Sequence, residues 1–393
     1  MVEEKSHQLS TLHFSSIFDQ LAESHLPFAI WRLPYEKTFQ CAISKNPVIN
    51  LQKIDLELLD PGFTFAPYSY VETKEAIFIK ADISFDFDSF DEPIEEDILE
   101  KIDLDSPKII KEKKSKVFQF NLRENKIEKS RFIEQVKLAI EAINQGYFEK
   151  VVLSRSKSIE RTESYSPISH FIRLCDAYPS VFCSLTYLPW TNEIWIGATP
   201  ENLVSQDENG IFKTMALAGT QSSINTLGEE ISNADAMWRQ KEIEEQALVS
   251  RYIINCFKKI RVREFDEIGP KSVKAGNLIH LQTAFEVNTN EIEFPQLGSI
   301  MIDLLHPTSA VCGMPQKPAQ DFISQTEDYD RSYYSGFLGP INIKNRTNIF
   351  VNLRTLKASK DKLTLYAGCG ITQDSNPEKE WIETQIKLKT VAI

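Results

Sequence analysis

The sequence predicts an α+β sandwich, a fold in which β-sheets pack face to face and helices cover them. Long segments rich in β-branched residues indicate strands. Helical segments lie between them without the regular strand–helix–strand alternation of a doubly wound sheet. The chain has 393 residues, of which 42% are hydrophobic, so it can bury a large core. Length alone suggests two or three domains, but it is only a soft guide to domain number.

A charged stretch divides the chain into two parts. Residues 82–116 begin with the acidic run DISFDFDSFDEPIEEDILEKIDLD and end with the basic run KIIKEKKSK. Such blocks are typical of solvated surface or of a flexible insertion. We therefore separate residues 1–125, which carry this variable charged insertion and no motif that we can interpret, from the motif-rich residues 126–393.

The motif-rich part begins with a helix and a strand. Ser130 is a candidate N-cap, apolar residues recur at helical spacing from Phe132 to Ile143, and Gly146 can end the helix. The segment KVVLSRSKSI, residues 150–159, follows as a strand because it is rich in β-branched residues. Further strands are expected at residues 181–188, 193–198, 348–357 and 362–368, and further helices at residues 234–258, 316–326 and 378–390.

Composition argues against several classes of protein. The net charge of −12 leaves no basic surplus for nonspecific nucleic-acid binding. The N-terminal run MVEEKSHQLS lacks the features of a signal or transit peptide, and no apolar run approaches the ~20 residues that span a bilayer. The six cysteines form no CxxC pair and are expected to be reduced and mostly buried. We therefore expect a cytoplasmic protein without a membrane partner.

Two helical segments carry glutamates three residues apart: Glu242 and Glu245 in one, Glu380 and Glu383 in the other. Residues at this spacing share one helix face, so each helix can present two carboxylates in the same direction. A hard cation such as Mg²⁺ relieves their repulsion, because it binds a few carboxylate oxygens and keeps open positions for an anionic substrate. For any single pair, two solvated glutamates are the more common explanation.

A lysine and a glutamate lie at the ends of predicted strands. Lys150 begins the strand 150–159, and Glu201 follows the strand 193–198. A buried lysine near a metal loses its proton more easily and can act as a general base, whereas a carboxyl group in a dry pocket can keep a proton to donate. A lysine at such a position is more often an ordinary surface charge. The runs MALAGTQ, VCGMP and YAGCGITQDS place glycines at strand ends, where the backbone can approach an anion closely.

Taken in order, these segments resemble the chorismate-utilising enzymes, a family that includes isochorismate, salicylate, anthranilate and aminodeoxychorismate synthases. The resemblance runs from about residue 130 to the end and is carried by FEKVVLSR, IGATPENLV, ALAGT, KEIEEQALV, HLQT, LLHPTSAVCGMP, RSYYSGFLGPI, NLRT and YAGCGITQDSNPEKEWIETQIKLKT. It implies two large, mainly antiparallel sheets packed as a sandwich, with helices outside and the active site in a deep cleft. It also implies that residues 1–125 belong to the same sandwich, within one composite domain.

The resemblance further implies roles for individual residues. Glu245 and Glu383 would bind Mg²⁺, which would hold the ring carboxylate of chorismate, and Glu242 and Glu380 would lie nearby as further ligands. The remaining positions match residues that bind the substrate: Arg354 and Lys387 through its carboxylates, Gly219, Thr220, Ala310 and Gly368 through the backbone, and His280 near the ring.

Two positions distinguish members of the family. Members that add an amine through an enzyme-linked intermediate carry a lysine nucleophile where this chain has Ala218, and the ammonia-using members have no lysine at the position of Lys150. We therefore predict an isochorismate synthase. In this reaction Lys150 deprotonates a water that attacks C2 of chorismate, and Glu201 protonates the C4 hydroxyl that leaves. Gln246 replaces the histidine that usually follows the first metal glutamate, which concerns tuning of the metal more than the reaction class.

Other functions stay open at this point. A salicylate synthase makes isochorismate and then eliminates pyruvate in the same pocket, and the anthranilate and aminodeoxychorismate synthases are less favoured alternatives. A non-catalytic protein could also keep the fold, although the four central residues Lys150, Glu201, Glu245 and Glu383 are intact. Isochorismate can serve menaquinone or siderophore synthesis. The resemblance implies chorismate as the small-molecule partner, no glutaminase subunit and a monomeric enzyme.

Overall fold

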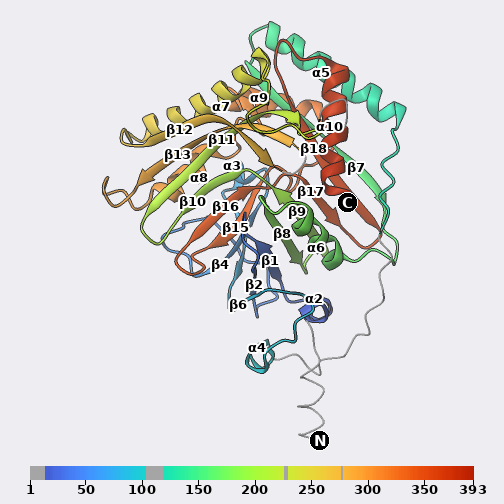
Figure 1. The fold of residues 1–393 in the computed structure, drawn as a ribbon, viewed down its shortest axis with the longest axis vertical. Coiled ribbons are helices and arrows are strands. Elements are labelled where there is room, and N and C mark those ends of the chain that lie inside the picture. The colour runs from blue at the N-terminus through green and yellow to red at the C-terminus, as the bar shows by residue number, and fades with distance from the viewer. Residues whose placement is uncertain (1–13, 103–117, 225–228, 276–277) are drawn as a thin grey trace, which may run out of the picture.

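The computed structural model describes residues 14–102, 118–224, 229–275 and 278–393. Two nine-stranded sheets form the centre of the molecule, and helices lie outside them (Figure 1). Neighbouring strands pair in antiparallel fashion throughout both sheets. The predicted α+β fold with two large antiparallel sheets is therefore confirmed.

The first sheet has the strand order β14-β7-β18-β17-β9-β8-β1-β2-β6. Its strands are β1 (Phe28–Arg32), β2 (Phe39–Ile43), β6 (Ile83–Phe87), β7 (Lys150–Glu160), β8 (Phe182–Leu188), β9 (Glu193–Thr199), β14 (Gly313–Met314), β17 (Thr355–Ala358) and β18 (Lys362–Ile371). β17 and β18 lie between β7 and β9, so this sheet joins segments that are far apart in the sequence.

The second sheet has the strand order β12-β13-β11-β10-β16-β15-β4-β5-β3. Its strands are β3 (Leu51–Gln52), β4 (Gly62–Ala66), β5 (Ala76–Lys80), β10 (Asn202–Gln206), β11 (Ile211–Ser222), β12 (Asp266–Ala275), β13 (Leu278–Asn288), β15 (Phe337–Ile341) and β16 (Thr347–Val351). Strands from the first hundred residues form one end of each sheet, so both sheets contain part of the N-terminal third of the chain.

Apolar side chains from both sheets meet in one buried cluster between them. Phe182 of β8 stacks on Phe350 of β16 with ring centroids 4.1 Å apart, and Trp31 of β1 lies 5.3 Å from Phe63 of β4. Such aromatic pairs contribute about 0.5–1.5 kcal/mol each beyond the area that they bury. These contacts hold the two sheets together face to face.

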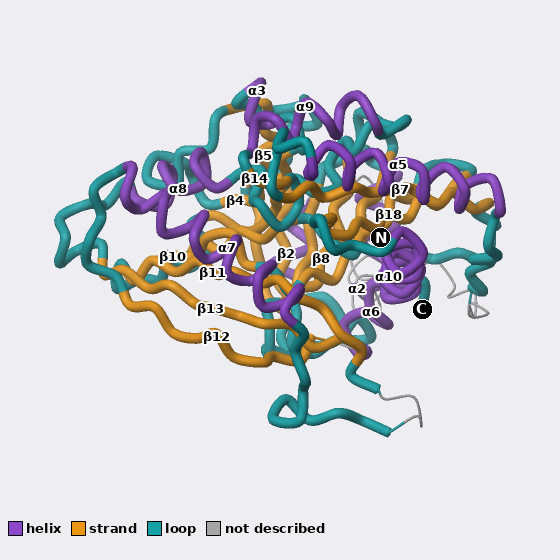
Figure 2. The backbone as a smooth tube through the Cα atoms, turned by 90° about the horizontal axis from the view of Figure 1, so that it is seen from above, coloured by secondary structure: helices purple, strands orange, loops and turns teal. Residues whose placement is uncertain are grey.

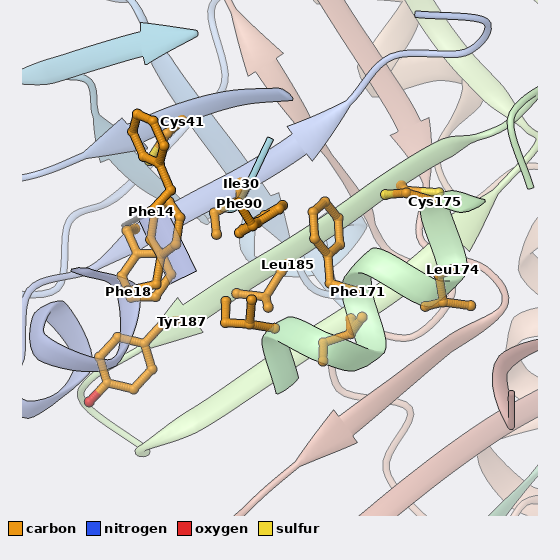
Figure 3. Close-up of a cluster of buried hydrophobic side chains, with 14 of the residues drawn as sticks. Phe14, Phe18, Ile30, Cys41, Phe90, Phe171, Leu174, Cys175, Leu185 and Tyr187 are labelled. Carbon is orange, nitrogen blue, oxygen red and sulfur yellow. The ribbon is translucent and has the colours of Figure 1, made fainter. Parts of the chain in front are cut away.

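Helices cover the outer faces of the sheets. They are α2 (Phe14–Glu23), α3 (Tyr70–Thr73), α4 (Glu96–Ile102), α5 (Lys126–Asn144), α6 (Pro167–Ala177), α7 (Gln240–Lys259), α8 (Leu297–Leu305), α9 (Gln316–Thr326) and α10 (Pro377–Val391). α5 and α10 lie side by side near β7 and β18, whereas α7 and α8 pack on the second sheet (Figure 2). α2 and α6 pack on the first sheet through side chains such as Phe18, Phe171 and Leu174 (Figure 3).

Two helix starts differ from the prediction. α5 begins at Lys126, because Asn125 is its N-cap and accepts hydrogen bonds from the backbone N–H groups of Ile127 and Glu128. The assignment of Ser130 as N-cap was therefore wrong by more than one turn. α7 begins at Gln240 rather than near residue 234. The strands predicted at 150–159, 181–188, 193–198 and 362–368 and the helices at 316–326 and 378–390 are confirmed within a few residues.

The prediction of one continuous strand at residues 348–357 is wrong, because the structure has two strands there. The chain forms β16 up to Val351 and β17 from Thr355, and these strands belong to different sheets. The three residues between them carry the chain from the second sheet to the first. One of them, Arg354, has a φ of 47° in the left-handed region, which breaks the strand.

The described part of the charged stretch 82–116 contains a strand and a helix. Residues 103–117 lie outside the described part of the chain. Before them, β6 pairs with β2, and α4 buries Ile98 and Leu99 in the cluster beneath α2. Apolar side chains between the acidic ones thus attach residues 83–102 to the core, and the variable insertion around residues 82–116 stays a prediction.

The cysteines agree with the prediction. All six are buried and none takes part in a disulfide. In the described ranges, no helix combines the length and the apolar character that crossing a membrane requires.

Candidate active site

A pocket between the two sheets gathers residues that are distant in the sequence. Strands β7, β11, β13 and β18, helices α7 and α10, and the connections after β9, α8 and β16 all contribute to its walls. Nine of the residues predicted from the sequence line it: Glu201, Gly219, Thr220, Glu245, His280, Ala310, Arg354, Gly368 and Lys387. The other four predicted residues, Lys150, Glu242, Glu380 and Glu383, do not line this pocket directly.

Lys150 is the first residue of β7, and its side chain is fully buried. Its Nζ donates a hydrogen bond to Glu245 Oε1 at 3.0 Å, and Glu245 lines the pocket. Burial opposes ionisation of Glu245, but the positive charges of Lys150 and Lys241 outweigh it and lower the pKa of this carboxyl group below its ordinary value. The lysine is thus held beside the pocket by an ionised carboxylate.

The contact between Lys150 and Glu245 depends on Gly370, which was not assigned a role from the sequence. Gly370 lies opposite Val152 in the β7–β18 pair. A Cβ atom at residue 370 would lie 2.6 Å from Glu245 Oε1 and 3.0 Å from Lys150 Cε. Glycine therefore leaves the space that the ion pair occupies. The run YAGCGITQDS was the available signal, but only Gly368 in it was singled out.

Glu201 follows β9 and is 4% exposed. Burial raises its pKa to about 7, although a hydrogen bond and three nearby cations lower it. The hydrogen bond comes from Thr308 Oγ1, which lies 3.3 Å from Glu201 Oε1. The cations are Lys150, Lys387 and Arg354. A carboxyl group with this pKa is partly protonated near neutral pH and can act as a general acid.

Arg354, at the crossing between the sheets, contacts a neutral histidine. Its Nη2 donates to His280 Nε2 at 2.7 Å. Burial and the charges of Arg354 and Lys387 lower the pKa of His280 well below its ordinary value. His280 Nδ1 lies 3.2 Å from both the Gly219 carbonyl oxygen and Thr220 Oγ1. A proton on Nδ1 satisfies the carbonyl and leaves Nε2 free to accept from the guanidinium, so His280 orients Arg354.

Lys387 of α10 is a second cation in the pocket wall. Its Nζ donates to Glu383 Oε1 at 2.7 Å and to the Gly368 carbonyl oxygen at 2.9 Å. Burial lowers the pKa of Lys387, but Glu383 outweighs this effect and raises it above the ordinary value. Lys387 and Arg354 therefore give the pocket two positive charges that suit the carboxylates of an anionic ligand.

Only one of the two carboxylate oxygens of Glu380 accepts a hydrogen bond. Lys241 Nζ donates to Glu380 Oε1 at 2.6 Å, whereas Oε2 is buried without a hydrogen-bond partner. Burial and then the neighbouring Glu383 raise the pKa of Glu380. In contrast, Glu242 Oε2 accepts a hydrogen bond from the backbone N–H of Arg239 at 2.9 Å and caps the start of α7.

These carboxylates suit Mg²⁺ in their chemistry, because hard oxygen ligands are the ones that it prefers. Within the described residues, no three His, Cys, Asp or Glu side chains are already arranged as a metal cluster. Glu245, Glu380 and Glu383 instead each contact a lysine. The unpartnered Oε2 of Glu380 is the observation that favours a further cation here.

Gln246 joins the pocket wall to α7. Its Oε1 accepts from the backbone N–H of Ala218 at 2.9 Å, and its Nε2 donates to the Ala216 carbonyl at 3.2 Å. Within β11, Gly219 forms a bulge with φ 65° where the strand approaches α7. A Cβ atom at this residue would lie 3.1 Å from Glu242 Cβ. Gln246 therefore holds β11 against α7 through uncharged hydrogen bonds. It does so at the position where the family resemblance implies a histidine.

Two tyrosines that were not predicted complete the wall. Tyr334 and Tyr366 line the pocket, and their rings stack with centroids 5.2 Å apart. Trp195 also stacks on Tyr366, with ring centroids 5.6 Å apart. The run RSYYSGFLGPI contained Tyr334, but an aromatic residue in a strand-rich chain more often indicates core than a ligand contact. Here the same rings belong to both the core and the pocket.

The chain is similar in sequence to several known proteins. A family model described as "Chorismate binding enzyme" matches residues 60–392. The vibriobactin-specific isochorismate synthase of Vibrio cholerae is 28% identical over 198 residues, which are 50% of this chain and 49% of that protein. Anthranilate synthase component 1 of Saccharolobus solfataricus is 27% identical over 283 residues, which are 70% of this chain and 64% of that protein.

The fold has a match among solved structures. The menaquinone-specific isochorismate synthase from Escherichia coli superimposes with a TM-score of 0.73 at 19% identity, covering 97% of this chain and 91% of that one. In the sequence comparisons, by contrast, the matched region spans only about half to two thirds of the length of these curated relatives.

Proposed function

The chain belongs to the chorismate-binding enzyme family, and from this premise we propose that it is an isochorismate synthase that uses Mg²⁺. The observation that carries the proposal is the combination, at one pocket, of a fully buried lysine and a buried glutamate with a pKa of about 7. Adding water at one ring carbon and removing a hydroxyl group from another requires a general base and a general acid of this kind.

In the proposed reaction Lys150 takes a proton from water as the water oxygen bonds to C2 of chorismate. Glu201 gives its proton to the C4 hydroxyl, which leaves as water while the ring double bonds shift. One water enters and one leaves, so the product, isochorismate, is an isomer of the substrate. Lys150 ends protonated and Glu201 ends ionised, and proton exchange with solvent restores both. General acid–base steps of this type contribute ~10²–10⁴-fold each.

The pocket charges support an anionic substrate with two carboxylates. Arg354, oriented by His280, offers a guanidinium fork, and Lys387 adds a second positive charge. Backbone groups at four further positions that line the pocket complete the proposed binding site: Gly219, Thr220, Ala310 and Gly368.

Glu245 and Glu383 would hold Mg²⁺ in this proposal, with Glu380 next to them. When bound, the metal would supply positive charge for the ring carboxylate of the substrate. Glu242 would take part only after giving up its contact with the Arg239 backbone. Each of these three carboxylates contacts a lysine side chain.

Water rather than an amine is the proposed nucleophile. Ala218 lines the pocket and its methyl group cannot attack a ring carbon. The relatives include both isochorismate and anthranilate synthases, so family membership alone does not decide between water and ammonia. Lys150 at the start of β7 favours water because it provides a base beside the pocket.

The identity of the reaction product tests the proposed function. Purified protein is incubated with chorismate and Mg²⁺, and the products are separated by chromatography. We expect isochorismate together with residual chorismate. Salicylate plus pyruvate would identify a salicylate synthase, and anthranilate formed only when ammonia is added would identify an amine-adding enzyme. Either outcome would contradict the proposed function.

We expect Glu383→Gln to weaken the dependence on magnesium. Removing the charge of one proposed ligand should raise the Mg²⁺ concentration for half-maximal rate by at least about tenfold. Glu378→Gln on the same helix is the control, because Glu378 is exposed and contacts Lys129 at the surface. A magnesium titration that is the same for Glu383→Gln and the wild-type protein would exclude Glu383 as a ligand.

A further inference from the structure

The edge of the first sheet beside the pocket is incomplete. β14 has only two residues and pairs with β7 at Lys150 and Val151, and the Val152 N–H still reaches the Cys312 carbonyl at 2.8 Å. In the described part of the chain, no strand continues along this edge, although β7 itself runs on to Glu160. The outward-facing backbone groups of β7 after this point therefore need other partners.

A buried ion pair takes the place of the missing strand. Arg331 Nη2 donates to the Val152 carbonyl at 2.8 Å, and Glu327 Oε1 accepts from the Ser154 N–H at 2.7 Å and from its Oγ at 2.8 Å. These are the backbone groups that a longer β14 would have paired. The side chains of Glu327 and Arg331 are each 3% exposed.

The geometry of this pair is bidentate. Arg331 Nη2 lies 2.6 Å from Glu327 Oε1, and Arg331 Nε lies 2.8 Å from Glu327 Oε2. Two ions without further hydrogen bonds are expensive to bury, but here three backbone groups and the Ser154 hydroxyl form further hydrogen bonds with the pair. These hydrogen bonds tie the ion pair to this position on the sheet edge.

Arg331 also contacts a second segment of the pocket wall. Its Nη1 donates to the carbonyl of Val311, which lines the pocket. Three residues earlier, Thr308 donates its hydroxyl proton to Glu201. The Tyr334 N–H, in turn, bonds to the Arg331 carbonyl at 2.9 Å. One side chain thus connects the strand that carries Lys150 with the segment that contacts Glu201.

We propose that the Glu327–Arg331 ion pair positions the two catalytic groups relative to each other. It fixes β7, and with it Lys150, against the segment 308–311, and with it Glu201. Neither Glu327 nor Arg331 lines the pocket, so they act through the backbone and are positioning residues. The proposal rests on the proposed function, because it assumes that Lys150 and Glu201 act on the same substrate.

The test uses Arg331→Lys in the full-length protein. Lysine keeps the charge but lacks the fork that joins two carbonyl oxygens and a carboxylate. A displacement of catalytic groups by ~1 Å costs about 10²-fold in rate, so we expect kcat to fall by about that factor while KM changes little. Glu327→Gln keeps an acceptor for the Ser154 amide, and we expect it to lose less activity than Glu327→Ala.

The control is Leu174→Ala, which destabilises the protein at a distance from the pocket. Leu174 belongs to the cluster under α6 (Figure 3) and lines no part of the site. The loss of melting temperature is measured for both variants, so that each kcat is judged against the loss of stability in the same variant. The proposal predicts a normal kcat for Leu174→Ala and a reduced kcat for Arg331→Lys. Equal kcat values in the two variants would show that Arg331 has only a general structural role and would overturn the proposal.

Hydrogen exchange gives a readout that does not depend on catalysis. We expect the amides of Val152 and Ser154 to exchange faster in Arg331→Lys than in Leu174→Ala. The Ser154 amide donates to Glu327, and the Val152 amide donates to Cys312 between the Val152 and Val311 carbonyls that Arg331 holds. Unchanged exchange at these amides would overturn the positioning role. If the wild-type protein does not convert chorismate, the proposed function fails, whereas the exchange measurement still decides whether the ion pair holds β7.

Discussion

Replacing Lys150 by alanine is expected to lower kcat by ~10²–10⁴-fold while the affinity for chorismate changes little. The side chain is fully buried and contacts Glu245 rather than lining the pocket, so its removal deletes the base without removing a wall of the binding site. Turnover is measured by following chorismate consumption with Mg²⁺ present. Binding is measured separately, by titration calorimetry of the inactive variant.

Lys157→Ala is the matched control for this experiment. Lys157 lies on the same strand, but its Nζ contacts Glu128 near the surface and it does not line the pocket. The loss of such a partly exposed pair costs roughly 1 kcal/mol of stability and should leave kcat unchanged. If Lys150→Ala keeps activity within a fewfold of the wild-type protein, Lys150 is not the base.

Glu201→Gln is expected to have an effect of similar size. The amide keeps the shape of the side chain but has no acidic proton, so we expect kcat to fall by ~10²–10⁴-fold. The pH profile provides the sharper measurement. Because the general acid must be protonated and its pKa is about 7, kcat/KM of the wild-type protein should decrease as pH rises above about 7. This decrease should be absent from the residual activity of Glu201→Gln.

Glu193→Gln tests whether a carboxylate at the other end of β9 has the same effect. Glu193 begins that strand and contacts Lys357 at 3.1 Å, away from the pocket lining. Its replacement should leave both kcat and the pH profile as they are in the wild-type protein. A decrease of kcat/KM near pH 7 that persists in Glu201→Gln would assign the titration to another group and remove Glu201 from the role of acid.

Residues at regular positions in helices and strands could be predicted from the sequence. Helical spacing places Glu380 and Glu383 on one side of α10, where both act on the same lysine, Lys241, by raising its pKa. Likewise, the β-branched run of β7 correctly places Lys150 at the start of a strand. Local periodicity is sufficient in these cases because the side-chain direction follows from the element itself.

The position of Arg354 could not be predicted in this way. Residues 348–357 have a continuous strand-like composition, and that pattern is the same whether a segment stays in one sheet or crosses to another. The partners of buried charges are also invisible to local patterns. Lys241 and Glu380 are 139 residues apart, and Arg331 and Val152 are 179 residues apart. Such contacts are decided by strand order, which depends on the whole fold.

The position of β17 and β18 in the first sheet has a consequence for the synthesis of this protein on the ribosome. The ribosome produces β7, β8 and β9 well before residues 355–371, which occupy the space between β7 and β9 in the finished sheet. Until those residues emerge, two strand edges at the centre of the future sheet have no native neighbours, and exposed edges of this kind pair readily with other chains. The nascent polypeptide is therefore most prone to aggregation late in translation, and a truncation before β17 would leave the strand of Lys150 without its principal neighbour.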